Sequence, residues 1–181
     1  LVENTPLDSP EPPFHLLRIY VECGHGSVVG QVKSKNGTTK LNISEIAFCN
    51  SNNSFSTSCF DGTIILFEFD NDARTWKKNV LDNPIKSVHN TAVTIPDSNG
   101  SIDDDELDEF AAYTLEWNCN DDILAVSVGI GHIVIFNART KKPFHTLSEH
   151  HNIIYVLNFH PKNPRILLSA SRDGFLMLWD V

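Results

Sequence analysis

Histidine and acidic side chains are the residues of this chain that could hold a metal ion. His145 and His150 have four residues between them, but the Cys-x2-Cys pair that would complete a zinc site does not accompany them. His150 and His151 are adjacent, so their rings point apart on a strand or loop. Asp97-Ser98-Asn99-Gly100 lacks the glutamate-terminated twelve-residue loop of a calcium site. The sequence therefore predicts no metal site and no cofactor.

Catalytic constellations are also missing from the sequence. It contains no Gly-x-Ser-x-Gly nucleophile elbow, and the stretch from Gly24 to Gly30 lacks the lysine and following helix of a phosphate-binding loop. The adjacent acids of residues 102–110 do not form a catalytic pair, because general acid–base chemistry needs two carboxyl groups in different environments. We expect a protein that is not an enzyme.

Charge is distributed unevenly along the 181 residues, whose formal net charge is −9. Ser87 through Ala138 contains ten acids and no Lys or Arg, while the other 13 acids nearly balance the 14 bases. Direct binding of nucleic acid requires a basic surface, so we predict none. No apolar run is long enough to cross a bilayer, and no membrane association is expected. The acidic tract is expected to be a solvated loop, with a basic partner as the alternative.

The four cysteines have no Cys-x2-Cys spacing and fall on or beside expected strands. We expect buried, reduced thiols, as in a cytosolic or nuclear protein. The chain begins Leu1-Val2-Glu3, without Met, and is expected to be a piece of a longer protein.

One strand ending recurs four times along the chain, at intervals of about 47, 69 and 43 residues: Tyr20-Val21, Phe67-Glu68, Phe136-Asn137 and Trp179-Asp180. Asp-Gly turns precede the second and fourth endings at a constant offset, at Asp61-Gly62 and Asp173-Gly174. A period of 40–45 residues with these features is typical of a four-stranded propeller blade. The predicted fold is all-β, a partial WD-repeat β-propeller of about four antiparallel four-stranded blades.

Turn residues and apolar runs divide the chain further. Residues 1–13 form a Pro-rich linker, residues 14–181 the propeller segment, and residues 82–111 an acidic loop inserted in the long interval. The expected strands, read between turn signals, are 14–22, 43–49, 55–59, 63–70, 75–80, 112–117, 123–128, 132–137, 143–147, 153–159, 165–171 and 174–180.

Several expected strands are apolar at nearly every position, as in Ile133 to Phe136 and Phe175 to Trp179. Such a strand is covered on both faces, which blades packed face to face provide. Repeat units bury their apolar faces only against neighbours. We therefore expect the isolated segment to expose two blade faces and to associate with itself.

Residues His150 to Val181 resemble the WD-repeat family. His150 takes the place of the family's Gly-His histidine, Asp173 lies in the tight turn, Trp179 ends the strand, and Ser169 or Ser171 supplies the strand hydroxyl. The resemblance implies a structural network of hydrogen bonds among these side chains, in which Asp61 is the counterpart of Asp173. In the second and third copies, Phe67 and Phe136 replace the tryptophan.

A narrower resemblance covers about residues 16–181. Residues 144–147 and 160–174 are similar to the bromodomain and WD-repeat proteins, which include the pleckstrin-homology-domain-interacting protein; residues 113–117 and 121–127 are similar in order and spacing. That family implies a nuclear scaffold of chromatin and transcription regulation that serves as a substrate receptor of cullin-RING ubiquitin ligases. Its partners are a ligase adaptor and chromatin or histone proteins. The motif His-Pro-x-x-Pro is also similar to a Polycomb-group WD-repeat protein, which makes a Polycomb-type histone-binding scaffold the alternative.

Two surface features could carry interactions. Arg139 keeps the arginine of the Trp-Asp-x-Arg pattern of adaptor docking, although Phe136 and Asn137 replace its Trp-Asp; an Arg paired with a neighbouring carboxylate is the other interpretation. Trp179-Asp180 keeps the start of the pattern and is the stronger candidate. Ser101 precedes Ile102-Asp103-Asp104 and suits an acid-directed kinase. A propeller-framed enzyme, an architectural repeat of a coat complex and a cytoplasmic location are the remaining alternatives.

Overall fold

The computed structural model describes residues 31–34, 37–40, 43–51, 53–85 and 111–181. Thirteen strands run through this part of the chain. In chain order they are β1 (Gln31–Ser34), β2 (Gly37–Lys40), β3 (Ile43–Phe48), β4 (Ser54–Cys59), β5 (Ile64–Asp70), β6 (Thr75–Leu81), β7 (Ala112–Trp117), β8 (Ile123–Val128), β9 (His132–Asn137), β10 (Lys142–Leu147), β11 (Ile154–Phe159), β12 (Ile166–Ser171) and β13 (Leu176–Asp180).

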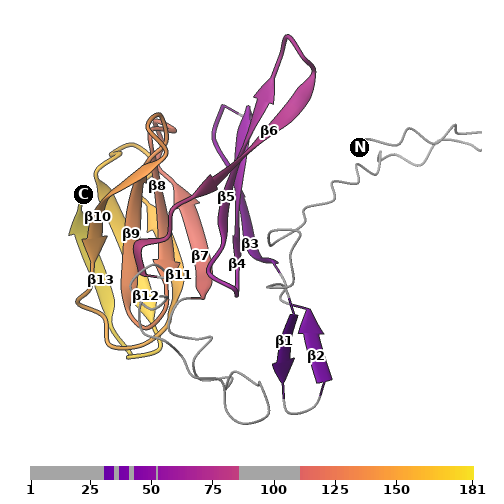
Figure 1. Cartoon of the computed structure of the whole chain (residues 1–181). Coiled ribbons are helices and arrows are strands. Elements are labelled where there is room, and N and C mark those ends of the chain that lie inside the picture. Colours follow the sequence, from indigo (N-terminus) through magenta and orange to yellow (C-terminus); the bar gives the residue numbers. More distant parts are fainter. Residues whose placement is uncertain (1–30, 35–36, 41–42, 52, 86–110) are drawn as a thin grey trace, which may run out of the picture.

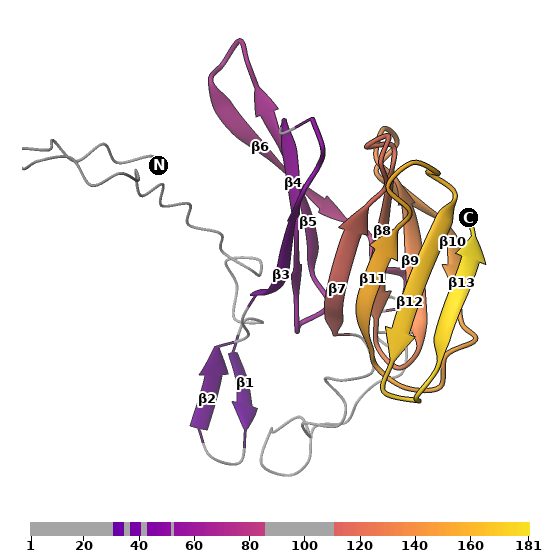
Figure 2. The same ribbon diagram turned by 180° about the vertical axis from the view of Figure 1, so that it is seen from behind.

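Within each sheet the strands are antiparallel, follow one another in chain order and are joined by short turns (Figure 1). β3–β6 make the first sheet, β7–β10 the second and β11–β13 the third, while β1 and β2 pair as a hairpin. Strand β7 contacts β3 of the first sheet and β11 of the third. Figure 2 shows the three sheets stacked side by side, with β7–β10 between the other two.

Apolar side chains fill both spaces between the sheets. The core between the first and second sheets includes Leu66, Trp117 and Phe136, and the core between the second and third includes Ile135, Leu157 and Leu167. The second sheet is covered on both faces, which explains why β9 has four consecutive buried residues. Each large aliphatic side chain buried in this way contributes about 1.5–3 kcal/mol.

This architecture confirms the predicted fold class, an all-β partial WD-repeat β-propeller. Three strands of the second sheet, β7, β8 and β9, have the predicted bounds. Most of the other predicted strands differ by one or two residues at an end. The hairpin β1–β2 was not predicted, because its residues carry no apolar period. The first expected copy, Leu16 to Tyr20, lies outside the described residues.

The expectation that β13 is covered on both faces is wrong. Pairing of β11, β12 and β13 places Val156, Leu168, Leu176 and Leu178 on the same face of the third sheet. All four are exposed, Leu176 and Leu178 to 71% and 70%. No described sheet packs against this face. The apolar sequence of β13 suits a strand with a neighbouring sheet on both sides, and the described residues provide a sheet on only one side.

The expectation of buried, reduced thiols is confirmed for Cys49, confirmed only in its reduced state for the partly buried Cys119, and wrong for Cys59. Cys49 and Cys119 are free, and Cys49 is buried. Cys59 is disulfide-bonded. Cys23 lies outside the described residues.

The start of the expected acidic insertion lies against the first sheet. Asn83 is buried and donates a hydrogen bond from Nδ2 to the carbonyl oxygen of Gly62 at 2.9 Å, and Ile85 packs on the core. The linker and residues 86–110, Ser101 among them, are outside the described residues. In the described ranges, no helix has the length and apolar character needed to span a membrane.

Candidate functional site

A hydrogen-bonded network of four side chains lies in the third sheet. His150, which is 3% exposed, contacts Asp173 Oδ2 through Nδ1 at 2.8 Å and Ser169 Oγ through Nε2 at 2.7 Å. The indole Nε1 of Trp179 donates to the same Ser169 oxygen at 2.8 Å. Because Asp173 can only accept, a proton on Nδ1 of His150 lets the Ser169 hydroxyl donate to Nε2 while accepting from Trp179. Each polar group of this network of four side chains thus has a hydrogen-bond partner.

Asp173 links this network to the backbone. It accepts hydrogen bonds from the backbone N–H groups of His151 and Phe175, both at 2.9 Å. Burial raises the pKa of the Asp173 carboxyl, but these two N–H donors and the His150 imidazole outweigh burial and hold the pKa well below its usual range. The carboxylate is therefore committed to ordering the β12–β13 turn.

Ser171 lies beside the network of four side chains but does not belong to it. Its hydroxyl contacts the carbonyl oxygens of Asn152 and Ile153, each at 3.0 Å, and accepts from the N–H of Asp173 at 3.2 Å. Of the two serines that the sequence left open, Ser169 is the one that meets the histidine and the tryptophan.

The other sheets carry degenerate versions of this arrangement. Strand pairing places Val126 of β8 and Thr57 of β4 at the position of Ser169, with Phe136 and Phe67 at the position of Trp179. In the second sheet the replacements are apolar and need no partner. In the first sheet the buried Thr57 hydroxyl has no hydrogen-bond partner among the residues that the structure describes.

Asp61, the counterpart of Asp173 in the first sheet, keeps the turn contact. It is 9% exposed and accepts a hydrogen bond from the N–H of Thr63 at 2.8 Å. Phe175 is the residue at the equivalent place in the third sheet, where its N–H binds Asp173. The two Asp-Gly turns are therefore built in the same way.

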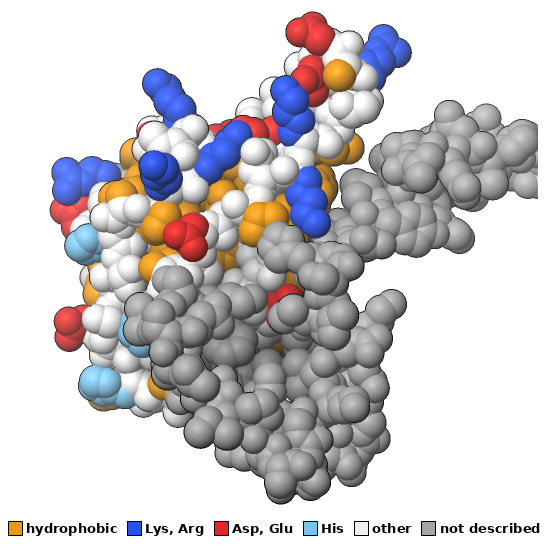
Figure 3. Space-filling model, in the orientation of Figure 1, with side chains coloured by type: hydrophobic (Ala, Val, Ile, Leu, Met, Phe, Trp, Pro, Cys, Tyr) orange, Lys and Arg blue, Asp and Glu red, His pale blue; other side chains and the backbone are white. Residues whose placement is uncertain are grey.

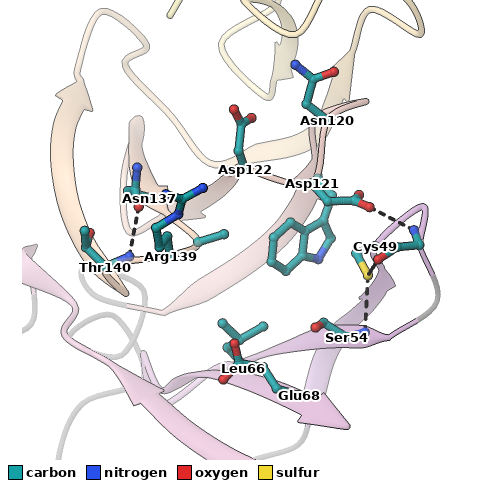
Figure 4. Close-up of a pocket in the computed structure, with 13 residues that line it drawn as sticks. Cys49, Ser54, Leu66, Glu68, Asn120, Asp121, Asp122, Asn137, Arg139 and Thr140 are labelled. Carbon is teal, nitrogen blue, oxygen red and sulfur yellow. Dashed lines mark hydrogen bonds between the residues drawn. The ribbon is translucent and has the colours of Figure 1, made fainter. Parts of the chain in front are cut away.

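A second feature is a cavity of about 510 Å³ between the first and second sheets. It lies at the end of the sheets where the β3–β4, β7–β8 and β9–β10 turns meet, and where Lys and Arg side chains gather along the upper edge of Figure 3. Leu66, Trp117 and Cys49 contribute apolar lining, while Asp121 and Arg139 contribute charge (Figure 4).

Asp121 ties the two walls of this cavity together. Its Oδ1 accepts hydrogen bonds from the backbone N–H of Asn50 at 2.7 Å and from Asn50 Nδ2 at 2.8 Å, and its Oδ2 accepts from the N–H of Ser51 at 2.8 Å. Asp121 adopts a positive φ of 59°, a conformation that Asp and Asn tolerate better than most residues. Burial raises the pKa of Asp121, but these donors outweigh it and lower the pKa from 3.8.

This shift predicts an acid-sensitive contact between the sheets. Because the folded pKa lies below the ordinary value of 3.8, the charge of Asp121 stabilises the fold fully above pH 3.8, and the contribution is lost as the pH falls through the folded pKa. The variant Asp121→Asn keeps shape and backbone preference but not charge. We expect the gap in unfolding free energy between wild type and this variant to shrink from pH 6 to pH 3. Denaturant titrations at both pH values measure the gap, and an unchanged gap would contradict the assignment.

The other carboxylates of the cavity also have partners. Glu68 Oε2 binds Lys141 Nζ at 2.5 Å and Asn79 Nδ2 at 2.8 Å. Asp122 Oδ1 accepts from Asn118 Nδ2 at 2.6 Å. These contacts fix the turns around the cavity.

Arg139 has no ion-pair partner among the described residues, although it is exposed and lines the cavity. Trp179 and Asp180 lie on another strand: Trp179 belongs to the hydrogen-bonded network, and Asp180 forms an exposed ion pair with Arg165 at 2.8 Å. The structure therefore leaves Arg139 as the one of these three side chains without a hydrogen bond or ion pair.

One pair of acids lies on the neighbouring strands β3 and β7. Glu116 is about half buried, and burial, with a smaller effect of the Glu45 charge, raises its pKa. Glu45 Oε2 accepts a hydrogen bond from the backbone N–H of Leu115 at 2.9 Å. Within the described ranges, no three His, Cys, Asp or Glu side chains converge in a way that could hold a metal ion.

The sequence did not reveal the contacts that join the sheets. Trp117 Nε1 donates to the buried Ser56 Oγ at 3.0 Å, and Asp121 reaches a turn 70 residues earlier. Gly131 lies against the backbone of His150. The Gly129-Ile130-Gly131 turn was a visible signal for a close backbone approach, whereas nothing in the sequence pairs Asp121 with the β3–β4 turn.

Residues 141–180 match the family described as WD domain, G-beta repeat. The matched segment contains β10–β13 and all four side chains of the hydrogen-bonded network. Among solved structures, the chain is similar to the beta-propeller domain of Myceliophteria thermophila Cps50 (Swd1), with a TM-score of 0.59 and 14% identity over 80% of this chain and 40% of that one. It is also similar to U3-55K, with a TM-score of 0.58 and 15% identity over 79% and 37% of the two chains.

Curated relatives include a Polycomb group protein FIE1 of Oryza sativa subsp. japonica, 31% identical over 83 residues, which are 44% of this chain and 17% of that protein. A second Polycomb group protein FIE1 of the same organism is 32% identical over 83 residues, 22% of its length. The match thus spans less than a quarter of either relative. Together the comparisons establish WD-repeat sequence and a propeller fold, and the narrower resemblance to the bromodomain and WD-repeat proteins stays a prediction.

Proposed function

We propose that this chain is the WD-repeat part of a nuclear, non-enzymatic protein-interaction scaffold that acts in chromatin and transcription regulation. The observation that carries the proposal is how the polar side chains are used. His150, Ser169, Asp173 and Trp179 satisfy one another inside the third sheet, which leaves them no capacity for a substrate. Their role is to stabilise the blade, and interaction falls to the turns at the ends of the sheets.

The similarity to Polycomb group proteins supports the chromatin setting. It favours the second candidate, a Polycomb-type histone-binding scaffold, over a repeat of a coat complex. An enzyme built on the propeller would need a reactive pair. Glu45 and Glu116 lie on neighbouring strands, and burial raises the pKa of Glu116. Glu45 is already bound to the backbone of Leu115, which speaks for a structural role.

Recruitment of a ubiquitin ligase is the finer part of the proposal. Arg139 is exposed, has no ion pair in the described ranges and takes the arginine position of the Trp-Asp-x-Arg pattern in the sequence, so it is the residue that we assign to adaptor binding. Asp180 is paired with Arg165, and Trp179 with Ser169, so we expect both to contribute less to docking.

Affinity purification of the full-length natural protein from nuclear extract, followed by quantitative mass spectrometry, tests these proposals. We expect enrichment of chromatin proteins and, with wild type but not Arg139→Ala, of a cullin-RING adaptor. Recovery of coat or transport components in place of chromatin proteins would contradict the scaffold proposal. Equal adaptor recovery with both forms would contradict only the role of Arg139.

The nuclear location is part of the proposal and needs a separate test, because the disulfide of Cys59 is unusual in a reducing compartment. Imaging of the full-length protein in cells is expected to show it in the nucleus. A secretory or purely cytoplasmic distribution would contradict that part.

A further inference from the structure

The cavity between the first and second sheets has a surplus of hydrogen-bond donors on one wall. Arg139 carries five N–H donors, none of which has a partner in the described structure. Beside it, Asn137 Oδ1 accepts a hydrogen bond from the N–H of Thr140 at 2.9 Å. The Nδ2 group of Asn137 can therefore donate to a ligand. Figure 4 shows these three residues on the same turn, which borders the cavity.

The acceptors of the cavity are largely occupied by the protein itself. Asp121 receives three hydrogen bonds from the β3–β4 turn, and Glu68 binds Lys141 and Asn79. Asp122 Oδ2 and Glu68 Oε1 are the carboxylate oxygens of the cavity for which no hydrogen bond is found within the described ranges. The balance therefore favours a ligand that brings an oxyanion to Arg139.

We propose that this cavity binds a peptide segment of a protein partner through an aspartate or glutamate carboxylate that pairs with Arg139. Arginine and carboxylate match each other as a bidentate pair. The ligand carries one negative charge, because one guanidinium faces it and the nearby carboxylate of Asp122 would repel a dianion such as phosphate. Asp122 Oδ2 is placed to accept an N–H of the same peptide.

The lining of the cavity, more than its volume of about 510 Å³, favours a peptide side chain over an apolar small molecule. Leu66, Trp117 and Cys49 are 2%, 6% and 3% exposed, so the base offers little apolar area to bind a hydrophobic molecule. Polar turns surround the opening. An acidic residue in an extended peptide can reach Arg139 from solvent while the flanking residues lie across the turns.

This inference rests on the scaffold proposal and gives the chemistry of the segment that is bound. The two can fail separately, because the affinity purification reports partners that bind anywhere on the full-length protein. The peptide experiment reports only the cavity.

The test is an NMR titration of the 181-residue chain carrying Leu178→Glu, which keeps it closer to a monomer, with three peptides of the form acetyl-Gly-Leu-X-Gly-Gly-amide, where X is Glu, Gln or phosphoserine. A single contact of this kind should give a dissociation constant on the order of 1 mM. We expect saturable shifts of the Asn137–Thr140 amides with the Glu peptide and at least about tenfold weaker binding of the Gln peptide. Arg139→Gln should abolish these shifts. Arg165→Gln removes the same charge at a site outside the cavity lining and should leave them unchanged.

Three results would overturn the proposal. Equal binding of the Glu and Gln peptides would show that the charge of the ligand plays no part. Tighter binding of the phosphoserine peptide would show a phosphate site in place of a carboxylate site. Absence of shifts with all three peptides, while the spectrum of Arg139→Gln shows an intact fold, would show that the cavity does not bind peptides.

Discussion

Replacing Gly131 with alanine should lower the free energy of unfolding by about 3–5 kcal/mol. Gly131 has a φ of +82°, which costs a residue with a Cβ about 1–3 kcal/mol. A Cβ at this position would lie 2.0 Å from the carbonyl oxygen and 2.6 Å from the carbonyl carbon of His150. Because the obstacle is backbone, the second and third sheets would have to move apart.

Gly174 provides a matched control for this prediction. Its φ of +86° is similar, but a Cβ there would meet nothing within 4 Å. Gly174→Ala should therefore cost only about 1–2 kcal/mol, the cost of the backbone conformation alone. Denaturant unfolding of the two variants separates conformation from close approach. Equal losses would contradict the contact between Gly131 and His150.

Replacing Ser169 with alanine should lower the free energy of unfolding by about 2–4 kcal/mol. The Ser169 hydroxyl is fully buried and is the shared partner of His150 Nε2 and Trp179 Nε1. Alanine would leave both nitrogens without a partner, and each buried unsatisfied group costs about 1–3 kcal/mol. Trp179→Phe removes a donor and leaves the pair of His150 and Ser169, so its smaller effect should be about 1–2 kcal/mol.

Ser148 is the control for Ser169, because it is exposed and lies in the connection between β10 and the third sheet. Ser148→Ala should change the unfolding free energy by less than about 0.5 kcal/mol. Unfolding followed by tryptophan fluorescence measures all three variants. If Ser169→Ala behaved like Ser148→Ala, the network would not contribute to stability.

The strands of the second sheet could be predicted from sequence because local signals agree there. Apolar runs such as Ile133 to Phe136 end at glycine or asparagine turns, and both faces of the sheet are covered. The positions of Asp173 and Asp61 followed from their Asp-Gly turns in the same way. Signals of this kind act within a few residues, which is the range over which a sequence pattern can be read.

Contacts between the sheets could not be predicted, because they join residues far apart in the chain. Asp121 meets Ser51 across 70 positions, and neither residue belongs to a motif. The sequence left open whether Arg139 is free for docking or paired with a neighbouring carboxylate. Only the fold shows that Asp121 and Glu68 are bound elsewhere.

The apolar faces at the two ends of the stack are the last consequence of the fold. Val156, Leu168, Leu176 and Leu178 are exposed on the third sheet. On the outer face of the first sheet, Ile46, Phe48 and Val80 are exposed, whereas Phe55, Ile65 and Phe67 on the same face are buried. The two surfaces differ, so copies that join through them would form head-to-tail assemblies, which grow beyond a dimer unless they close into a ring.

Sedimentation equilibrium of the 181-residue chain measures most directly whether apolar sheet faces in this fold require a neighbour. We expect an average mass above the 20.3 kDa of one chain that rises with concentration, and a shift toward 20.3 kDa in the variant Leu178→Glu. A mass of 20.3 kDa for the wild type at every concentration would contradict the account.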